Sequence, residues 1–181
     1  MKGSKPLNDK EIKLMLNQMT SERNKAFLIL GIKTGFRVSE LLSLTVGDVI
    51  QYDKIKDSIT VKRSSMKGKL SSRTVVLHKE AKEALIELLS TMDNGNFIET
   101  KLFPIGRQQA HKIIKQAANR AKIEGKVSTH SMRKSFAKKI YNALKRDLIN
   151  TQKALGHKSV QSTCSYLEFD NVVIDNAILE N

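Results

Sequence analysis

The stretch STHSMRKSF, residues 128–136, places a histidine and an arginine three positions apart, at His130 and Arg133. At helical spacing these two side chains lie on one face, one turn apart. An imidazole can accept or donate a proton near neutral pH, and a guanidinium stays charged and binds phosphate through two parallel hydrogen bonds. Lysines nearby would suit a solvated helix face, but they do not account for this pair. Both groups can bind a phosphate, and the function of the pair depends on what else the chain contains.

The overall charge points to the same kind of ligand. The 181 residues contain 32 Lys and Arg against 18 Asp and Glu, which gives a net charge of +14. A surface with this excess attracts polyanions and speeds association with them, so nucleic acid is the expected partner. Aromatic residues make up only 5% and tryptophan is absent, which argues against a stacking platform for single strands.

The sequence also bears on the compartment. Cys164 is the one cysteine, so the chain cannot form an internal disulfide, which suits a reducing compartment. No apolar run approaches the length of a membrane span, and the N-terminal stretch MKGSKPLNDKEIK lacks the core of a signal peptide. We therefore expect a cytoplasmic protein with no membrane partner.

The elements that must position these residues are mostly helical. Asn8 and Glu11 have the spacing of a capping box at the first helix, and Gly35 is a stop signal for the second. The β-branched runs at residues 57–64 and 71–78 flank the polar turn SMKGKLS and predict a hairpin with a basic tip. The fold class expected is α+β, mostly α-helical with a small antiparallel sheet at one edge. Helices are predicted at residues 7–19, 21–35, 38–49, 79–92, 106–123, 130–144, 150–157 and 171–179.

Four short stretches then occur in a specific order. These are TGFRVSELLSL with Arg37, STHSMRKSF, LGHKS with His157, and SYLEF with Tyr166, nine residues after that histidine. Together with the basic hairpin, they resemble the catalytic domain of the tyrosine recombinases, the phage-integrase family of site-specific DNA recombinases. Each piece alone can arise by chance, but the ordered set is specific, and the resemblance runs from KPLNDKEIK to SYLEF.

The resemblance implies an enzyme that cuts and rejoins DNA through a 3′-phosphotyrosyl intermediate, without a metal, another cofactor or ATP. Tyr166 would be the nucleophile, and Arg37 and Arg133 would stabilise the phosphorane-like transition state. Because a free phenol has a pKa of about 10, nearby cations are needed to favour the phenolate. His130 would assist acid–base chemistry near the tyrosine, and His157 would orient the phosphate.

Other residues are expected to support these groups. Glu40, three residues after Arg37, could pair with it and hold its guanidinium in place. In the family, a hairpin lysine protonates the leaving 5′ oxygen and stands five residues before an arginine that matches Arg73 here. That position is Gly68, flanked by Lys67 and Lys69; we choose Lys67 because K-G matches the family's turn better, with Lys69 as the alternative. The cations expected to bind the DNA backbone are Lys69, Arg73, Lys134 and Lys158.

The resemblance also implies a domain organisation and an assembly. The chain starts about where the catalytic domain of the family starts, so we expect residues 1–181 to form a single catalytic domain, without the N-terminal core-binding or arm-binding domain. The partner is double-stranded DNA, with a monomer in free solution and a homotetramer in synapsis. The tail, residues 171–181, packs on its own core or is exchanged between protomers. The setting expected is a mobile genetic element in a prokaryotic or phage-host cell, near the nucleoid.

Two other functions fit parts of the pattern. Charge and helices alone fit a non-catalytic DNA-binding regulator or a decayed integrase. The same chemistry fits a type IB topoisomerase-like enzyme, which relaxes one duplex without exchanging partners. Trapping of a covalent DNA adduct separates the first alternative from the recombinase, and a plasmid relaxation assay compared with a two-site recombination assay separates the second.

Overall fold

The computed structural model describes residues 3–61, 72–92, 98–167 and 179. The chain divides into two compact units, Met1–Phe136 and Ala137–Asn181, and the boundary falls within helix α7 (Thr129–Ala143). Lys67 and Lys69, and all of the tail at residues 171–181 apart from Leu179, lie outside the described residues. The expectations about the general acid and the tail therefore stay predictions.

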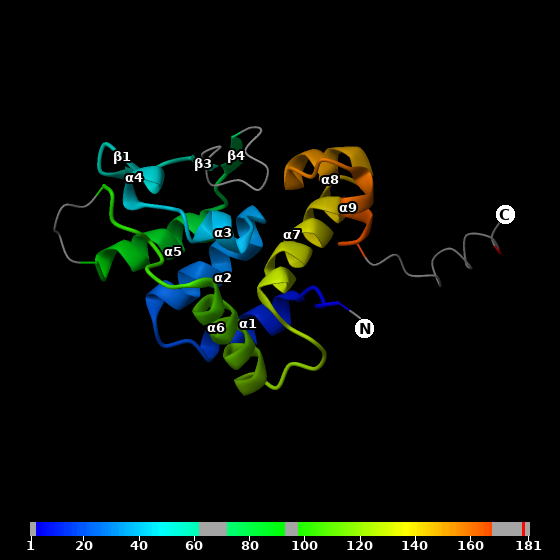
Figure 1. Cartoon of the computed structure of the whole chain (residues 1–181), viewed down its shortest axis with the longest axis horizontal. Coiled ribbons are helices and arrows are strands. Elements are labelled where there is room, and N and C mark those ends of the chain that lie inside the picture. Colours follow the sequence, from blue (N-terminus) through cyan, green and yellow to red (C-terminus); the bar gives the residue numbers. More distant parts are fainter. Residues whose placement is uncertain (1–2, 62–71, 93–97, 168–178, 180–181) are drawn as a thin grey trace. The chain divides into compact units, whose positions relative to one another are not determined.

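The first unit is mostly helical with small antiparallel sheets, as the sequence predicts (Figure 1). Its helices, besides the start of α7, are α1 (Asp9–Asn17), α2 (Glu22–Thr34), α3 (Val38–Leu41), α4 (Val46–Val49), α5 (Lys79–Ser90) and α6 (Arg107–Arg120). Its strands are β1 (Ile50–Gln51), β2 (Lys54–Ile55), β3 (Ser58–Val61) and β4 (Arg73–Val76). The second unit contains the rest of α7, α8 (Leu148–Leu155) and α9 (Val160–Cys164).

The predicted start of α1 and end of α2 are confirmed. The backbone N–H of Glu11 donates to the Asn8 side chain at 2.9 Å, and the Asn8 N–H donates to the Glu11 carboxylate at 3.0 Å. These two bonds satisfy donors that a helix N-terminus otherwise leaves open. Gly35 follows α2 in the left-handed conformation, with φ of 61°. That glycine turns the chain sharply toward Arg37.

The antiparallel pairing of the two predicted strands is also confirmed, and the basic tip expected between them lies outside the described residues. Strands β3 and β4 pair antiparallel, with Val61 opposite Arg73. Beside this pair the structure differs from expectation. The single helix expected over residues 38–49 is instead two one-turn helices, because the backbone N–H and hydroxyl of Thr45 bind Asp48 at 2.9 and 3.0 Å and start α4 anew. A second small sheet, β1 with β2, follows it and was not predicted.

The core of the first unit forms around α2, which runs beside α5 (Figure 1). The rings of Phe27 and Phe103 meet edge to face, with centroids 5.2 Å apart. This geometry is favourable for aromatic pairs and adds to the burial of their apolar area. Other large side chains buried in this core are Leu28, Leu30, Ile32, Phe36, Leu41, Leu44, Ile59, Leu85 and Leu102.

Two glycines let α7 approach α2 closely. Gly31 and Gly35 are four residues apart, as are Met132 and Phe136, which pack against them. A β-carbon on Gly31 would lie 2.6 Å from the Met132 sulfur, and one on Gly35 would overlap the Phe136 ring. This packing brings the start of α7, which carries Arg133, against the turn that carries Arg37.

The N-terminal segment fixes α7 from its other side. The Leu7 backbone N–H donates to the Ser135 hydroxyl at 2.7 Å, and the Lys5 N–H donates to the Lys126 carbonyl at 2.9 Å. Ser135 is buried and its hydroxyl also donates to the Ser131 carbonyl at 2.7 Å. The segment thus adds hydrogen bonds that hold the first turns of α7 in place.

Candidate active site

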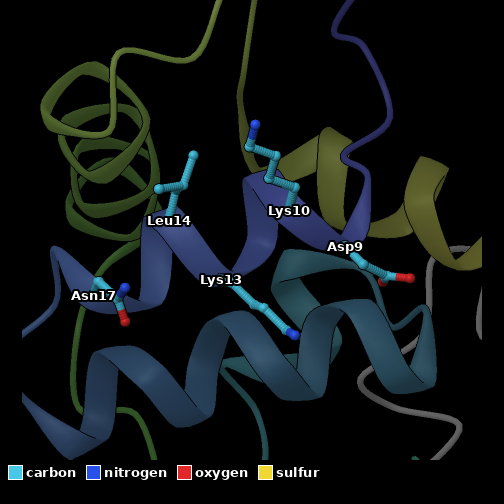
Figure 2. A pocket seen from close by; sticks show the side chains of 5 residues that line it. All are labelled: Asp9, Lys10, Lys13, Leu14 and Asn17. Atoms are coloured by element: carbon cyan, nitrogen blue, oxygen red, sulfur yellow. The ribbon is translucent and has the colours of Figure 1, made fainter.

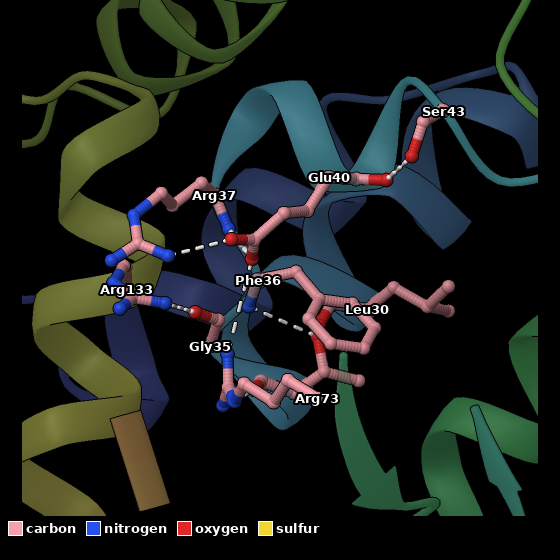
Figure 3. A network of polar contacts seen from close by, with 9 residues as sticks. Leu30, Gly35, Phe36, Arg37, Glu40, Ser43, Arg73 and Arg133 are labelled. Atoms are coloured by element: carbon pink, nitrogen blue, oxygen red, sulfur yellow. Dashed lines mark hydrogen bonds and ion pairs between the residues drawn. The ribbon is translucent and has the colours of Figure 1, made fainter. Parts of the chain in front are cut away.

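Arg37 is held by a buried carboxylate. Its backbone N–H and its Nη1 donate to the two oxygens of Glu40, at 2.8 and 2.6 Å (Figure 3). The Glu40 side chain is 0% exposed, whereas the Arg37 side chain is 27% exposed. One end of this ion pair is therefore fixed in the interior, and the guanidinium of Arg37 keeps a face on the surface of the unit. The pairing predicted from the three-residue spacing is present.

Arg133 binds the same turn from α7. Its Nη1 donates to the carbonyl oxygen of Gly35, two residues before Arg37 (Figure 3). The residue is only 2% exposed, so its guanidinium is held largely by the protein. The structure thus brings Arg37 and Arg133 to one turn, from segments almost 100 residues apart in the sequence.

Arg73, which the sequence predicts to bind the DNA backbone, is buried in the first unit. The residue is only 8% exposed. Its Nη2 donates to the Thr34 carbonyl at 2.9 Å, and its Nη1 lies 3.9 Å from Glu40. Two arginines, Arg37 and Arg73, therefore flank the Glu40 carboxylate, and the contact with Arg73 was not predicted from sequence spacing.

His130 lies in a cluster of cations. Burial, and then the positive charges of Arg107, Arg133, His111 and Lys134, lower the pKa of His130 from its ordinary value. At neutral pH the imidazole is therefore uncharged and able to accept a proton. Arg107 was not predicted as a site residue. The sequence feature that indicates it is its four-residue spacing from His111 on the exposed face of α6.

His157 and Tyr166 form a compact group in the second unit. Their ring centroids are 5.0 Å apart with the planes at 63°, and Nδ1 of His157 is 2.9 Å from the buried hydroxyl of Thr163. Gln152 fixes the histidine backbone, because its side chain donates to the His157 carbonyl at 3.0 Å and its own carbonyl accepts the His157 N–H at 3.2 Å. The predicted nucleophile and the predicted phosphate-orienting histidine are thus held side by side.

The remaining predicted residues divide into two groups. Lys134 is half-buried at the start of α7, and Lys158 is exposed just before α9. Lys67 and Lys69 lie outside the described residues. The first unit thus assembles the arginines and His130, and the second unit assembles His157 with Tyr166.

A pocket on α1 is separate from the predicted site residues. Figure 2 shows its five lining side chains, all from α1: Asp9, Lys10, Lys13, Leu14 and Asn17. None of the predicted site residues lines it. Across residues 3–61, 72–92, 98–167 and 179, no group of three or more His, Cys, Asp or Glu side chains could hold a metal ion, and no helix is long and apolar enough to cross a bilayer.

Solved recombinase structures share this fold. The chain matches the XerH site-specific recombinase bound to palindromic difH substrate, in a post-cleavage complex, with a TM-score of 0.72 and 26% sequence identity. The match covers 98% of this chain and 53% of that chain. The fold is therefore that of a tyrosine recombinase catalytic domain.

The family follows from the sequence comparison. The model of the phage integrase family matches residues 5–171, so the chain belongs to that family. It is 32% identical over 154 residues to the tyrosine recombinase XerH of Campylobacter jejuni, covering 82% of this chain and 42% of that protein. It is 34% identical over 167 residues to the tyrosine recombinase XerD of Neisseria meningitidis, covering 88% and 55%. The chain thus spans about half the length of these relatives.

Proposed function

We propose that this chain is the catalytic part of a site-specific DNA recombinase in which Tyr166 cuts and rejoins one strand at a time. The phenolate oxygen of Tyr166 attacks the scissile phosphorus, and the bond between phosphorus and the 5′ oxygen breaks. The product is a 3′-phosphotyrosyl link and a free 5′ hydroxyl. Because one phosphodiester is exchanged for another, the reverse attack by a 5′ hydroxyl rejoins the strand without ATP.

Each proton has a proposed carrier. His130, uncharged at neutral pH, accepts the phenolic proton, and Lys67 protonates the leaving 5′ oxygen, with Lys69 as the alternative. Arg37 and Arg133 bind the nonbridging oxygens, whose negative charge grows in the transition state. His157 binds a further phosphate oxygen beside the nucleophile.

The observation that carries this proposal is that Arg133, on α7, binds the turn that carries Arg37. Glu40 binds Arg37 and the Gly35 carbonyl binds Arg133. Guanidinium groups held in advance stabilise developing charge without reorganising during the reaction. A protein that only bound DNA would gain little from burying arginines, because phosphate contacts at a surface need only exposed charge.

The proposed substrate is duplex DNA. The net charge of +14 and the cations Arg107, His111 and Lys134 around His130 favour a polyanion. The solved XerH site-specific recombinase is bound to palindromic difH substrate in a post-cleavage complex, which supports the same class of ligand here. We propose that the two units, each with its own part of the catalytic set, act on the same phosphodiester.

The proposed assembly is a tetramer on synapsed DNA and a monomer in free solution, in the cytoplasm of a prokaryotic or phage-host cell. The tail at residues 171–181 would link neighbouring protomers. Analytical ultracentrifugation of the chain with DNA, with and without residues 171–181, tests this link. If the truncated chain assembles on DNA as the full chain does, the exchange of the tail is wrong.

Covalent trapping tests the reaction itself. The chain is incubated with a pool of nicked suicide duplexes of randomised sequence, and covalent adducts are isolated under denaturing conditions and sequenced. We expect adducts enriched in one sequence for the unaltered chain and none for Tyr166→Phe, which binds the pool equally well. Binding without any adduct would instead indicate a non-catalytic regulator. Relaxation of supercoiled plasmid without any two-site product would indicate the topoisomerase.

A further inference from the structure

Arg73 is buried at the loop end of the β3–β4 pair. It is the first residue of β4 and pairs with Val61, and its side chain is 7% exposed. The guanidinium carbon lies 5.3 Å above the centre of the Phe36 ring, which attracts a cation through its electron-rich face. The side chain therefore points into the interior of the first unit.

Its nitrogens reach two acceptors of the turn that carries Arg37. Nη2 donates to the Thr34 carbonyl at 2.9 Å, and Nη1 lies 3.9 Å from Oε2 of Glu40. Figure 3 shows the side chain of Arg73 reaching this turn from one side, while Arg133 reaches it from α7 on the other. Arg73 and Arg133 thus bind two consecutive carbonyls, those of Thr34 and Gly35.

The charges around Arg73 agree with a site in which Arg37 and Arg73 share the carboxylate of Glu40. Burial lowers the pKa of Arg73 to about 10, with repulsion from Arg133 and Arg37 adding to the shift and attraction to Glu40 opposing it. At neutral pH the group is still charged. The Glu40 carboxylate is therefore balanced between two cations, Arg37 at 2.6 Å and Arg73 at 3.9 Å.

We infer that Arg73 is a positioning residue for the transesterification, acting through Glu40 and the Thr34 carbonyl on Arg37, and that it does not contact the DNA backbone. This rests on the proposed function. By attracting Oε2, Arg73 keeps the carboxylate oriented so that Oε1 faces the guanidinium of Arg37. By binding the Thr34 carbonyl, it also holds the turn from which Arg37 projects.

This role needs the forked shape of arginine. A guanidinium has five N–H donors in one plane, so a single side chain can serve a carbonyl and a carboxylate at once. A lysine at the same position keeps the charge but carries it on one ammonium nitrogen, which cannot reach both acceptors. Arg73→Lys should therefore preserve much of the electrostatic balance and lose one of the two contacts.

The test compares catalysis with binding for Arg73→Lys and Arg73→Gln. Single-turnover adduct formation is measured with saturating protein on a suicide duplex that the unaltered chain cleaves. We expect the rate to fall roughly tenfold for Lys and on the order of 100-fold for Gln, because small misplacements of a catalytic group have large effects. DNA affinity as a function of salt should keep its slope. Arg107→Gln is the matched control, since loss of an exposed phosphate contact should lower that slope by about one.

The opposite pattern would overturn the inference: a salt slope lowered by about one with an unchanged adduct rate means that Arg73 binds a phosphate. A failure of the proposed function is distinct, because then the unaltered chain forms no adduct at all. Thermal melting shows whether each variant folds. If Arg73→Gln does not fold, the comparison is made with Arg73→Lys alone.

A double variant separates positioning from a purely structural role. If Arg73 acts through Arg37, adding Arg73→Lys to Arg37→Lys should slow adduct formation little beyond Arg37→Lys alone. If the two losses multiply as independent effects, the positioning role is wrong.

Discussion

The hydroxyl oxygen of Thr163 lies 2.9 Å from Nδ1 of His157, three residues before the tyrosine whose ring contacts the same histidine. The bond fixes the plane of the imidazole and assigns Nδ1 to the protein, so that a phosphate oxygen would be bound through Nε2. Thr163 is fully buried, which makes its hydroxyl a fixed partner and not an exposed one. The orientation of His157 is therefore set by Thr163, which was not predicted as a site residue.

Replacing Thr163 by valine should slow catalysis without weakening DNA binding. Valine keeps the branched shape and removes the hydroxyl, so the imidazole loses its partner and samples other orientations. We expect single-turnover adduct formation to fall roughly tenfold. Thr163→Ser, which retains the hydroxyl, should react at close to the original rate. Equal rates for the valine and serine variants would show that the hydroxyl does not position His157.

Replacing Glu40 by glutamine should lower both stability and activity. The carboxylate is completely buried and lies near the guanidinium groups of Arg37 and Arg73, so its loss leaves two cations with no balancing charge. Breaking a buried ion pair from one side costs about 3 kcal/mol of unfolding free energy. Urea denaturation measures this change, and the suicide-substrate assay should show a slower reaction as Arg37 loses its fixed orientation.

Glu22→Gln is the matched control for that experiment. Glu22 also pairs with a cation three residues away, Lys25 at 2.7 Å, but this pair is on the surface. Surface pairs add little to stability because water screens them. The control should therefore leave the urea midpoint and the reaction rate unchanged. If Glu40→Gln is as harmless as Glu22→Gln, the buried carboxylate does not organise the arginines.

Local signals predicted much of the fold. The Asn8–Glu11 capping box, the stop at Gly35 and the β3–β4 hairpin are encoded by neighbouring residues, and all are present. The link between Arg37 and Glu40 was predicted for the same reason, because three residues separate them on one turn. For these contacts between residues close in sequence, spacing and residue type were sufficient.

Contacts between distant segments were not predicted. The burial of Arg73 depends on Glu40 and Thr34, more than 30 residues earlier, and no periodicity in the sequence indicates such a contact.

Two local features were also missed. The β1–β2 turn was not predicted because Tyr52 and Asp53 both adopt positive φ, of 50° and 56°, without the glycine that usually marks such a turn. The Thr45–Asp48 capping pair was visible in the sequence, but the apolar run LLSLTV hid it within a longer helix.

Replacing Gly35 by alanine should destabilise the chain and slow the reaction together. The residue has φ of 61°, and a β-carbon there would overlap the Phe136 ring. Left-handed strain and overpacking together should lower the unfolding free energy by about 2–4 kcal/mol. Displacement of the backbone at residue 35 would also move the Gly35 carbonyl, which binds Arg133. Gly106→Ala is the control, because φ there is −82° and no atom lies within 4 Å of the added carbon. Equal urea midpoints for the two variants would contradict this account.

The protonation of His130 gives a prediction about pH. Because burial and the charges of Arg107, Arg133, His111 and Lys134 lower its pKa, His130 should titrate below the ordinary value of about 6.5 in the free chain. If the neutral imidazole accepts the phenolic proton, activity falls as the pH drops through this lowered pKa, and so persists into mildly acidic solution. Removing one positive neighbour with Arg107→Gln should raise the pKa and move the acid limb of the rate profile to higher pH.

Nuclear magnetic resonance titration of the imidazole C–H signals measures the pKa directly, with His130 identified by the signal lost in His130→Gln. Lys115→Gln is the matched control, since Lys115 is an exposed cation of the same helix α6 but is not among the charges that shift His130. The control should leave the titration curve in place while Arg107→Gln moves it upward. If both variants shift the curve equally, the effect belongs to the net charge of the surface and not to the cluster around His130. If Arg107→Gln raises the pKa of the His130 imidazole but leaves the acid limb of the pH–rate profile unchanged, His130 is not the proton acceptor.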